Sequence, residues 1–323
     1  MKEEILLKTF GLSVNFPVKK AFPFGKKEYV QAVTDVSIEM KKGETFGLVG
    51  ESGCGKSTFA NASLGILKPT EGEIFYRGQN VQNMDVENTK RMRREMQKIF
   101  QNPAASLNPR FTVLQLVEEP LVIRGGYSLE ERKKMVTEML KKVGLSEADL
   151  FRYPSDFSGG QQQRIAIARA LILKPEYLVC DEPVSALDVS VHAQILNLLM
   201  EMQKEMNITY LFISHNLAVV KKICDRVAIM YLGKVVEYGD AEKIFANPMH
   251  PYTKALISAV LTMEVDGEEE KITLQGDVPS PIHPPAGCRF CTRCPVAKPD
   301  CGQKESPLVE VEEGHFVACR YCL

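Results

Sequence analysis

Residues 50–57 read Gly50-Glu51-Ser52-Gly53-Cys54-Gly55-Lys56-Ser57, and this stretch decides the fold. The apolar run at 44–49 predicts a short buried strand before it, and a helix can begin at Thr58. Glycines at this spacing let the backbone turn tightly and point its N–H groups at phosphate oxygens. The stretch therefore predicts a phosphate-binding loop, in which Lys56 reaches the β- and γ-phosphates and Ser57 binds Mg²⁺. The alternative is a glycine-rich turn that matches by chance.

A second apolar run, at residues 177–180, ends in two carboxylates, Asp181 and Glu182. Asp181 is expected in the Mg²⁺ shell, the usual role of the acid that closes this strand. Glu182 is expected to polarise the attacking water as a general base. Paired acids at a strand end can also be solvated loop residues, and the loop at 50–57 favours the catalytic interpretation.

Three further residues carry weaker signals. Gln101 follows an apolar pair and is expected to reach both the metal and the lytic water, although a single Gln is usually polar surface. His215 ends the apolar run at 212–214, where an imidazole can hold the γ-phosphate or serve the structure alone. Asp188 closes the stretch at 185–188 just beyond Glu182, which also fits an ordinary helix start. Their order and spacing together are specific.

With Phe157-Ser158-Gly159-Gly160-Gln161 added, the chain resembles the nucleotide-binding subunit of an ABC transporter over essentially its whole length. The matching motifs are the Walker A loop (50–57), the Q-loop (Gln101), the signature (157–161, with Phe where Leu is usual), Walker B (179–182), the D-loop (185–188) and the switch histidine (His215).

The resemblance implies an ATPase that works as a head-to-tail pair. Each ATP would lie between the loop at 50–58 of one subunit and the signature of the other. Ser158, Gly159, Gly160 and Gln161 would then complete the partner's γ-phosphate site, and Asp188 of the D-loop is expected among the nucleotide-binding residues. Splitting these groups between two subunits makes hydrolysis conditional on closure.

Phe16 stands where this family places an aromatic ring that stacks on adenine. The segment that follows it is long and offers Phe22, Phe24 and Tyr29 as rivals. The adenine contact is therefore the least specific of the matches.

Composition places the chain among ordinary soluble proteins. It has 323 residues, a net charge of −1 and an apolar fraction of 45%. This charge gives no electrostatic reason to expect nucleic acid. No apolar run approaches the ~20 residues that cross a bilayer, and Met1 opens no signal-peptide core. A role at a membrane is therefore expected only through partner subunits.

The predicted fold class is α/β, a P-loop NTPase with a parallel core sheet covered by helices on both faces. The resemblance adds an antiparallel β subdomain. Residues 1–245 are expected to form the ATPase domain, with a helical subdomain at about 102–170. Apolar residues recur at helical spacing from Met135 to Val143, and Gly144 is a plausible stop. Residues 246–323 are expected to form a C-terminal extension.

The extension is rich in proline and cysteine. It holds six of the nine cysteines, at 288, 291, 294, 301, 319 and 322. Half of the prolines lie there too, so regular elements cannot dominate. So small a segment struggles to build its own core, and a metal centre would supply stability. Disulfides are the alternative, but the chain is expected to be cytosolic, where thiols stay reduced.

The phrases at 247–253, 276–281 and 287–290 resemble the tail of oligopeptide and dipeptide importer ATPases. Within that group, the phrases at 105–110 and 210–215 resemble the second ATPase, the F-type subunit. The family's four tail cysteines map onto Cys288, Cys294, Cys301 and Cys319, which in some members hold a [4Fe–4S] cluster. Cys291 and Cys322 are additions to that pattern. A Cys₄ zinc site is the competing prediction.

The resemblance implies an ATPase that powers peptide import from the cytoplasmic face of the membrane, with ATP and Mg²⁺ bound. Expected partners are a homologous D-type ATPase, two permeases and an extracytoplasmic peptide-binding protein. Two alternatives remain open: a soluble ABC ATPase for iron–sulfur assembly, and an importer of another cargo such as nickel or an oligosaccharide. Co-purification with permeases or with assembly proteins would separate the first two.

Overall fold

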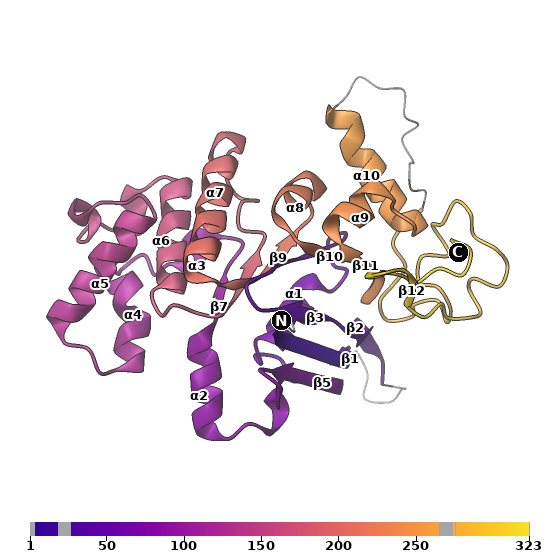
Figure 1. Ribbon diagram of the computed structural model, residues 1–323, viewed down its shortest axis with the longest axis horizontal. Helices are drawn as coiled ribbons and strands as arrows, with labels where there is room; N and C mark the ends of the chain where they lie inside the picture. Colours follow the sequence, from indigo (N-terminus) through magenta and orange to yellow (C-terminus); the bar gives the residue numbers. More distant parts are fainter. Residues whose placement is uncertain (1–3, 19–26, 265–273, 275, 323) are drawn as a thin grey trace. The chain divides into compact units, whose positions relative to one another are not determined.

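The computed structural model describes residues 4–18, 27–264, 274 and 276–322 (Figure 1). The chain forms two compact units. The first, called the loop unit, takes its described residues from Ile5–Met40, Glu44–Asn83 and Phe212–Leu323. The second, called the helical unit, is built mainly from Met84–Leu211. Strand β9 (Thr209–Ser214) carries the chain from the helical unit into the loop unit.

One sheet of the loop unit is antiparallel, in the order β2-β1-β5-β6 with β3 beside β1. Its strands are β1 (Ile5–Pro17), β2 (Tyr29–Val36), β3 (Glu39–Lys41), β5 (Glu71–Tyr76) and β6 (Gln79–Asn80). This sheet is the antiparallel part that the family resemblance implied.

The other strands of the loop unit run in the order β12-β13-β11-β10-β4. They are β4 (Thr45–Val49), β10 (Arg226–Tyr231), β11 (Lys234–Asp240), β12 (Val309–Glu312) and β13 (His315–Val317). Only β4 and β10 pair in parallel here, and the other pairs are antiparallel. All five residues of β4 are buried, as predicted for the apolar run before the loop.

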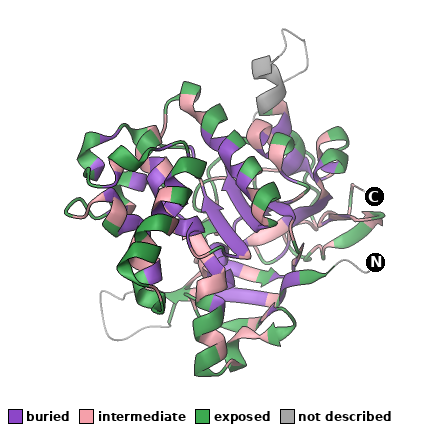
Figure 2. Cartoon of the chain, turned by 60° about the vertical axis from the view of Figure 1, so that its left-hand side comes forward, coloured by how far each residue is buried: buried purple, intermediate pink, exposed green. Residues whose placement is uncertain are grey.

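The helices of the loop unit include a final pair that leads into the cysteine-rich region. They are α1 (Lys56–Ser63), α8 (Leu217–Ile223), α9 (Ala241–Ala246) and α10 (Pro251–Glu264), with a 3₁₀ turn at Val81–Asn83. The two tail strands extend the sheet of the loop unit through β11. Buried residues are concentrated in strands, whereas the helices carry many exposed residues (Figure 2).

The helical unit pairs β7 (Met96–Ile99) with β8 (Tyr177–Asp181) in parallel. Its helices are α2 (Val86–Glu95), α3 (Pro103–Ser106), α4 (Val113–Arg124), α5 (Leu129–Lys142), α6 (Gly159–Leu171) and α7 (Val189–Met206), with 3₁₀ turns at Glu147–Asp149 and Pro154–Asp156. Helix α5 ends where predicted, because Gly144 has a φ of 77° that continues no helix. Among the described residues, no helix is both long and apolar enough to span a membrane.

Candidate nucleotide-binding site

The loop at 50–57 joins strand β4 to helix α1, as predicted. Two of its glycines are required by close approach of the backbone. A Cβ on Gly50 would lie 2.1 Å from the carbonyl oxygen of Met230, and one on Gly55 would lie 2.1 Å from that of Ala32. Gly55 also has a φ of 109° just before the helix begins. The loop is therefore held tightly against two neighbouring strands.

Lys56 opens helix α1 and is only 6% exposed. Its ammonium donates to the carbonyl oxygens of Gly50 at 2.7 Å and Glu51 at 2.9 Å. The positive charge is thus held over the loop that was predicted to bind phosphate. A phosphate group would replace neutral carbonyls with a charged acceptor, which makes a stronger hydrogen bond.

The other loop residues divide by exposure. Ser52, Gly53 and Ser57 are exposed, and Thr58 is half-buried. Cys54 is buried, and burial raises the pKa of its thiol. Its side chain therefore serves packing, whereas its backbone belongs to the loop.

The aromatic candidates for adenine stacking lie on neighbouring strands. Phe16 on β1 is 39% exposed, and Tyr29 on β2 is 42% exposed. The pairs Phe16 with Val30 and Pro17 with Tyr29 place both residues near the same end of the sheet. Phe22 and Phe24 lie outside the described residues.

His215 follows β9 in the loop unit and is exposed. The next residue, Asn216, caps helix α8 by accepting from the amides of Ala218 at 3.1 Å and Val219 at 3.3 Å. This turn sets the histidine at a strand end, the place that the sequence predicted.

In the helical unit, the two acids and Gln101 lie together. Strands β7 and β8 are parallel and Ile99 pairs with Cys180, so both strands end at the same edge. Just beyond it, the Gln101 amide donates to the Glu182 carboxylate at 2.8 Å. The structure therefore brings these two candidate residues into contact.

Asp181 has a partner that the sequence did not reveal. The Lys98 ammonium lies 2.8 Å from its carboxylate, and both side chains are nearly buried. Because β7 and β8 are adjacent, this lysine on β7 can reach the last residue of β8. No motif at Lys98 pointed to this contact.

The signature serine opens helix α6 in a capping box. Ser158 Oγ accepts from the amide of Gln161 at 3.4 Å, and the Gln161 side chain accepts from the amide of Ser158 at 3.0 Å. Gly160 lies close to α7, because a Cβ there would be 2.6 Å from a methyl of Val191. Asp188 precedes α7, is exposed and makes no cap hydrogen bond with its side chain.

The six tail cysteines are reduced and partly exposed in the loop unit. The chain folds back on itself here, with the Cys288 amide donating to the Cys301 carbonyl at 2.7 Å. Burial is the main cause that raises the pKa of Cys288 to about 11, and the nearby thiols of Cys291, Cys294 and Cys319 contribute to the same rise. A hydrogen bond from the Cys322 thiol lowers the pKa of Cys319 to about 6.

Cysteine thiolates are ligands that soft metals prefer, so the residue types fit such a centre. Within the described part of the chain, however, no three Cys, His, Asp or Glu side chains are placed so that they could hold a metal ion. The described cysteines form no disulfide bond, so the structure does not support the disulfide alternative either.

The sequence also missed the residues that contact the loop from the tail. Arg293 pairs with Glu51 at 2.7 Å, and the Tyr252 hydroxyl accepts from the Glu51 amide at 3.0 Å. The partners are separated by 242 and 201 residues, and no local pattern marks such a pair.

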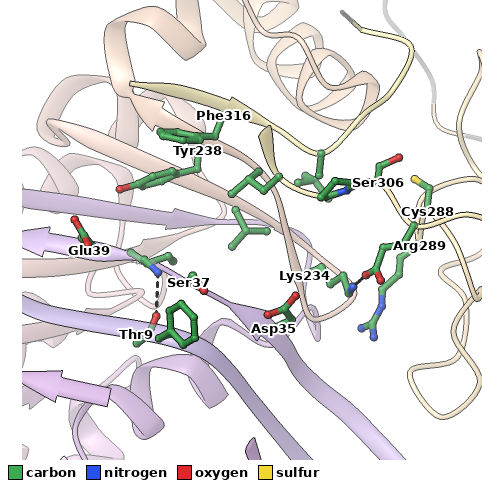
Figure 3. Close-up of a pocket in the computed structure, with 18 of the residues that line it drawn as sticks. Thr9, Asp35, Ser37, Glu39, Lys234, Tyr238, Cys288, Arg289, Ser306 and Phe316 are labelled. Atoms are coloured by element: carbon green, nitrogen blue, oxygen red, sulfur yellow. Dashed lines mark hydrogen bonds and ion pairs between the residues drawn. The ribbon is translucent and has the colours of Figure 1, made fainter. Parts of the chain in front are cut away.

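A separate cavity of about 790 Å³ lies in the loop unit (Figure 3). Its lining includes Asp35, Ser37, Tyr238 and Phe316, and none of the residues at 50–58. Three of its four cations pair with acids: Lys8 lies 2.5 Å from Glu39, Arg226 lies 3.3 Å from Glu44, and Lys234 pairs with Glu305. The fourth, Arg289, donates to the neutral groups of Leu232, Gln31 and Thr34. This cavity is therefore a poor second site for a phosphate.

Comparisons with known proteins agree with this geometry. The sequence profile of a family described as "ABC transporter" matches residues 33–185, and one described as "Oligopeptide/dipeptide transporter, C-terminal region" matches residues 236–301. The chain is 48% identical over 320 residues to the oligopeptide transport ATP-binding protein AppF of Bacillus subtilis, covering 98% of this chain and 97% of the relative. The chain belongs to the ABC transporter ATP-binding proteins. Membership in this ABC ATPase family implies binding of ATP and Mg²⁺.

A second ABC relative is the dipeptide transport ATP-binding protein DppF of Haemophilus influenzae, which is 48% identical over 314 residues. The match covers 97% of this chain and 96% of DppF. Among solved structures, the ABC cassette MJ0796 as a dimer bound to ADP and Pi matches with a TM-score of 0.63 and 32% identity. That match covers 73% of this chain and 99% of the cassette. The cbiO1 structure from Clostridium perfringens matches with a TM-score of 0.65, 28% identity and coverage of 81% and 100%.

Proposed function

We propose that this protein is the ATP-hydrolysing subunit of an importer of dipeptides or oligopeptides. The observation that carries the proposal is the near full-length similarity to transport ATP-binding proteins named for these cargoes. The intact set of loop, acid and signature residues supports its catalytic part. ATP binding closes a head-to-tail pair of ATPases, and hydrolysis opens it again.

In the proposed mechanism, the residues at 50–58 bind the phosphates and Lys56 compensates their charge. Glu182 accepts a proton from the attacking water, and Gln101 orients Glu182 through their hydrogen bond. Phe16 stacks on the adenine and His215 contacts the γ-phosphate. Ser158, Gly159, Gly160, Gln161 and Asp188 act on the ATP of the partner subunit, so neither subunit hydrolyses ATP alone.

Ser57, Gln101 and Asp181 would hold the Mg²⁺ that neutralises charge on the phosphate oxygens. The partner ATPase is proposed to be a homologous D-type subunit, with two permeases and an extracytoplasmic peptide-binding protein completing the assembly. The residues from 102 to 170 are proposed to contact a permease, which places the protein at the cytoplasmic face of the membrane.

The finer proposal for the tail is a [4Fe–4S] cluster held by Cys288, Cys294, Cys301 and Cys319. It is supported by the resemblance of the tail and by the thiol chemistry. Oxygen-free purification followed by assays of iron, acid-labile sulfide and zinc tests it. We expect about four irons per chain in the wild type and a loss in Cys294→Ser, with Cys291→Ser unchanged. Zinc without sulfide would assign the site to zinc instead.

Transport tests the main proposal. The assembly, reconstituted in vesicles with its peptide-binding protein, is expected to accumulate peptide only when ATP is supplied, and Lys56→Ala is expected to abolish uptake. Uptake of nickel or an oligosaccharide but not of peptide would favour the cargo alternative. The alternative in iron–sulfur assembly is not favoured by the relatives, and copurification with assembly proteins instead of permeases would revive it.

A further inference from the structure

In the segment from Cys288 to Cys294, residues between the cysteines contact the nucleotide loop or its neighbours. Its cysteines are at 288, 291 and 294, and the residues between them include Arg289, Phe290 and Arg293. Arg289 and Phe290 are buried. This spacing gives one short segment two faces, one of thiols and one of contacts with the loop unit.

Arg293 grips the carboxylate of Glu51, the second residue of the loop, with both ends of its guanidinium. The two N–O distances are 2.7 and 3.1 Å, and the arginine side chain is only 8% exposed. A two-bond fork between an arginine and a carboxylate fixes direction as well as distance. Because the arginine is shielded from water and the Glu51 side chain is 27% exposed, salt screens the pair less than a fully exposed ion pair.

Glu51 is held at its backbone as well. Its amide donates to the Tyr252 hydroxyl at 3.0 Å, and its carbonyl accepts from Lys56 at 2.9 Å. Tyr252 is fully buried and packs on Phe290 and Tyr231, with ring centres 5.3 and 4.8 Å away. Amide, carbonyl and carboxylate of one loop residue are therefore all fixed.

A second line of contacts reaches the other side of the loop. Arg289 donates to the carbonyl of Leu232, to Gln31 at 2.6 Å and to Thr34 at 3.0 Å. The turn that it holds donates back to the loop, from the Gly233 amide to the Cys54 carbonyl at 2.8 Å. The cysteine-rich segment thus supports the loop at both of its sides.

We propose that Arg293 is a positioning residue for the nucleotide loop, acting through Glu51 with Tyr252 as a second support. The proposal rests on the assignment of residues 50–58 as the ATP-binding loop. Holding the loop open in its phosphate-binding shape lowers the ordering cost of ATP binding. Arg293 does not touch the reacting atoms, so its loss affects binding and spares the chemical step.

The test measures ATP affinity and turnover of the reconstituted assembly. We expect Arg293→Gln to raise KM for ATP about 10-fold or more while kcat stays within about twofold. Glu51→Gln leaves the tail intact and is expected to raise KM by a similar factor, and the double variant by no more than either. Arg293→Lys is expected to recover part of the affinity.

Lys304→Gln is the matched control, since it removes one exposed cation from the same tail. An unchanged KM in Arg293→Gln and Glu51→Gln would overturn the proposal, as would multiplying effects in the double variant. A drop in kcat alone would also contradict it. Lys56→Ala tests the assignment of residues 50–58 as the ATP-binding loop separately from the role of Arg293. Unchanged ATP binding in this variant would refute the loop assignment, whatever the result for Arg293.

Discussion

Glu182 combines a catalytic assignment with an unusual backbone. Its φ of 49° lies in the left-handed region, which costs a residue with a side chain about 1 kcal/mol or more. The conformation turns the chain sharply after β8, and its side chain meets Gln101 there. A strained backbone of this kind persists only where the surrounding structure holds it in place. At Glu182 the strained conformation directs the carboxylate toward Gln101.

Replacing Glu182 with Gln should remove the base and keep the shape. We expect ATP hydrolysis by the assembly to fall by about 10²-fold or more, with ATP retained in a closed state. Turnover and bound nucleotide after gel filtration measure the two effects, with Glu138→Gln on exposed α5 as the control. Near-normal turnover would mean that Glu182 is not the base.

His250 gives the loop unit a dependence on pH. Burial lowers its pKa from 6.5 to about 3, and its neutral Nδ1 accepts from the Tyr252 amide at 3.1 Å. Below pH 6.5 the His250 side chain binds a proton in the unfolded chain, whereas in the folded chain it stays neutral down to about pH 3. Stability is therefore lost as pH falls from 6.5 toward 3, by about 1.4 kcal/mol per pH unit.

His250→Asn keeps an acceptor for that amide and removes the titration. Between pH 7.5 and 5 we expect the wild type to lose about 2 kcal/mol more than this variant, measured by urea unfolding. Parallel losses in the two proteins would show that His250 is not the group responsible.

Sequence reasoning placed Gln101 and Glu182 after apolar runs, and the structure brings their side chains together. Parallel strands end at one edge of a sheet, where residues from separate motifs can meet. Lys98 and Arg293 could not be found, because a lone cation pairs with an acid far along the chain only after folding. The predicted α/β fold with parallel core strands is confirmed, and β11 and the tail strands add antiparallel pairs to the sheet of the loop unit.

At the scale of elements, helices α5 and α6 begin alike. Ser128 and Ser158 each form a capping box with the residue three positions later. Only Ser158 belongs to the signature, so one serine is assigned two tasks and the other has a structural task alone. Comparing variants of Ser128 and Ser158 therefore distinguishes an effect on helix stability from an effect on contact with ATP.

Ser128→Ala and Ser158→Ala should each cost about 1 kcal/mol of stability, because each loses its N-cap. We expect only Ser158→Ala to lower ATPase activity of the assembly. Thermal unfolding and turnover, measured on both variants, give the comparison. Equal activity in the two would remove Ser158 from the proposed site.

At the scale of the molecule, a buried carboxylate joins the tail to the rest of the loop unit. Glu237 on β11 is fully buried and accepts from the amides of Met249 and His250, each at 2.9 Å. His315 on β13 lies 2.8 Å from the same carboxylate. One side chain thereby joins β11, the start of α10 and the final hairpin.

Glu237→Ala should cost about 3–5 kcal/mol, because the amides and the imidazole lose a buried partner. Denaturant unfolding measures this loss, and Glu242→Ala on exposed α9 is the control. If the two variants unfold at the same denaturant concentration, Glu237 is not the fastening point.

The contact between Arg293 and Glu51 bears on how such subunits can be recombined. A tail grafted onto an ATPase whose loop has no acid at the position of Glu51 would leave its arginine without that partner, and the recipient loop would lack this support. Gln31 and Thr34, which receive Arg289, would also have to travel with it. The tail is thus not a portable module, and changes in it and at position 51 are expected to be inherited together.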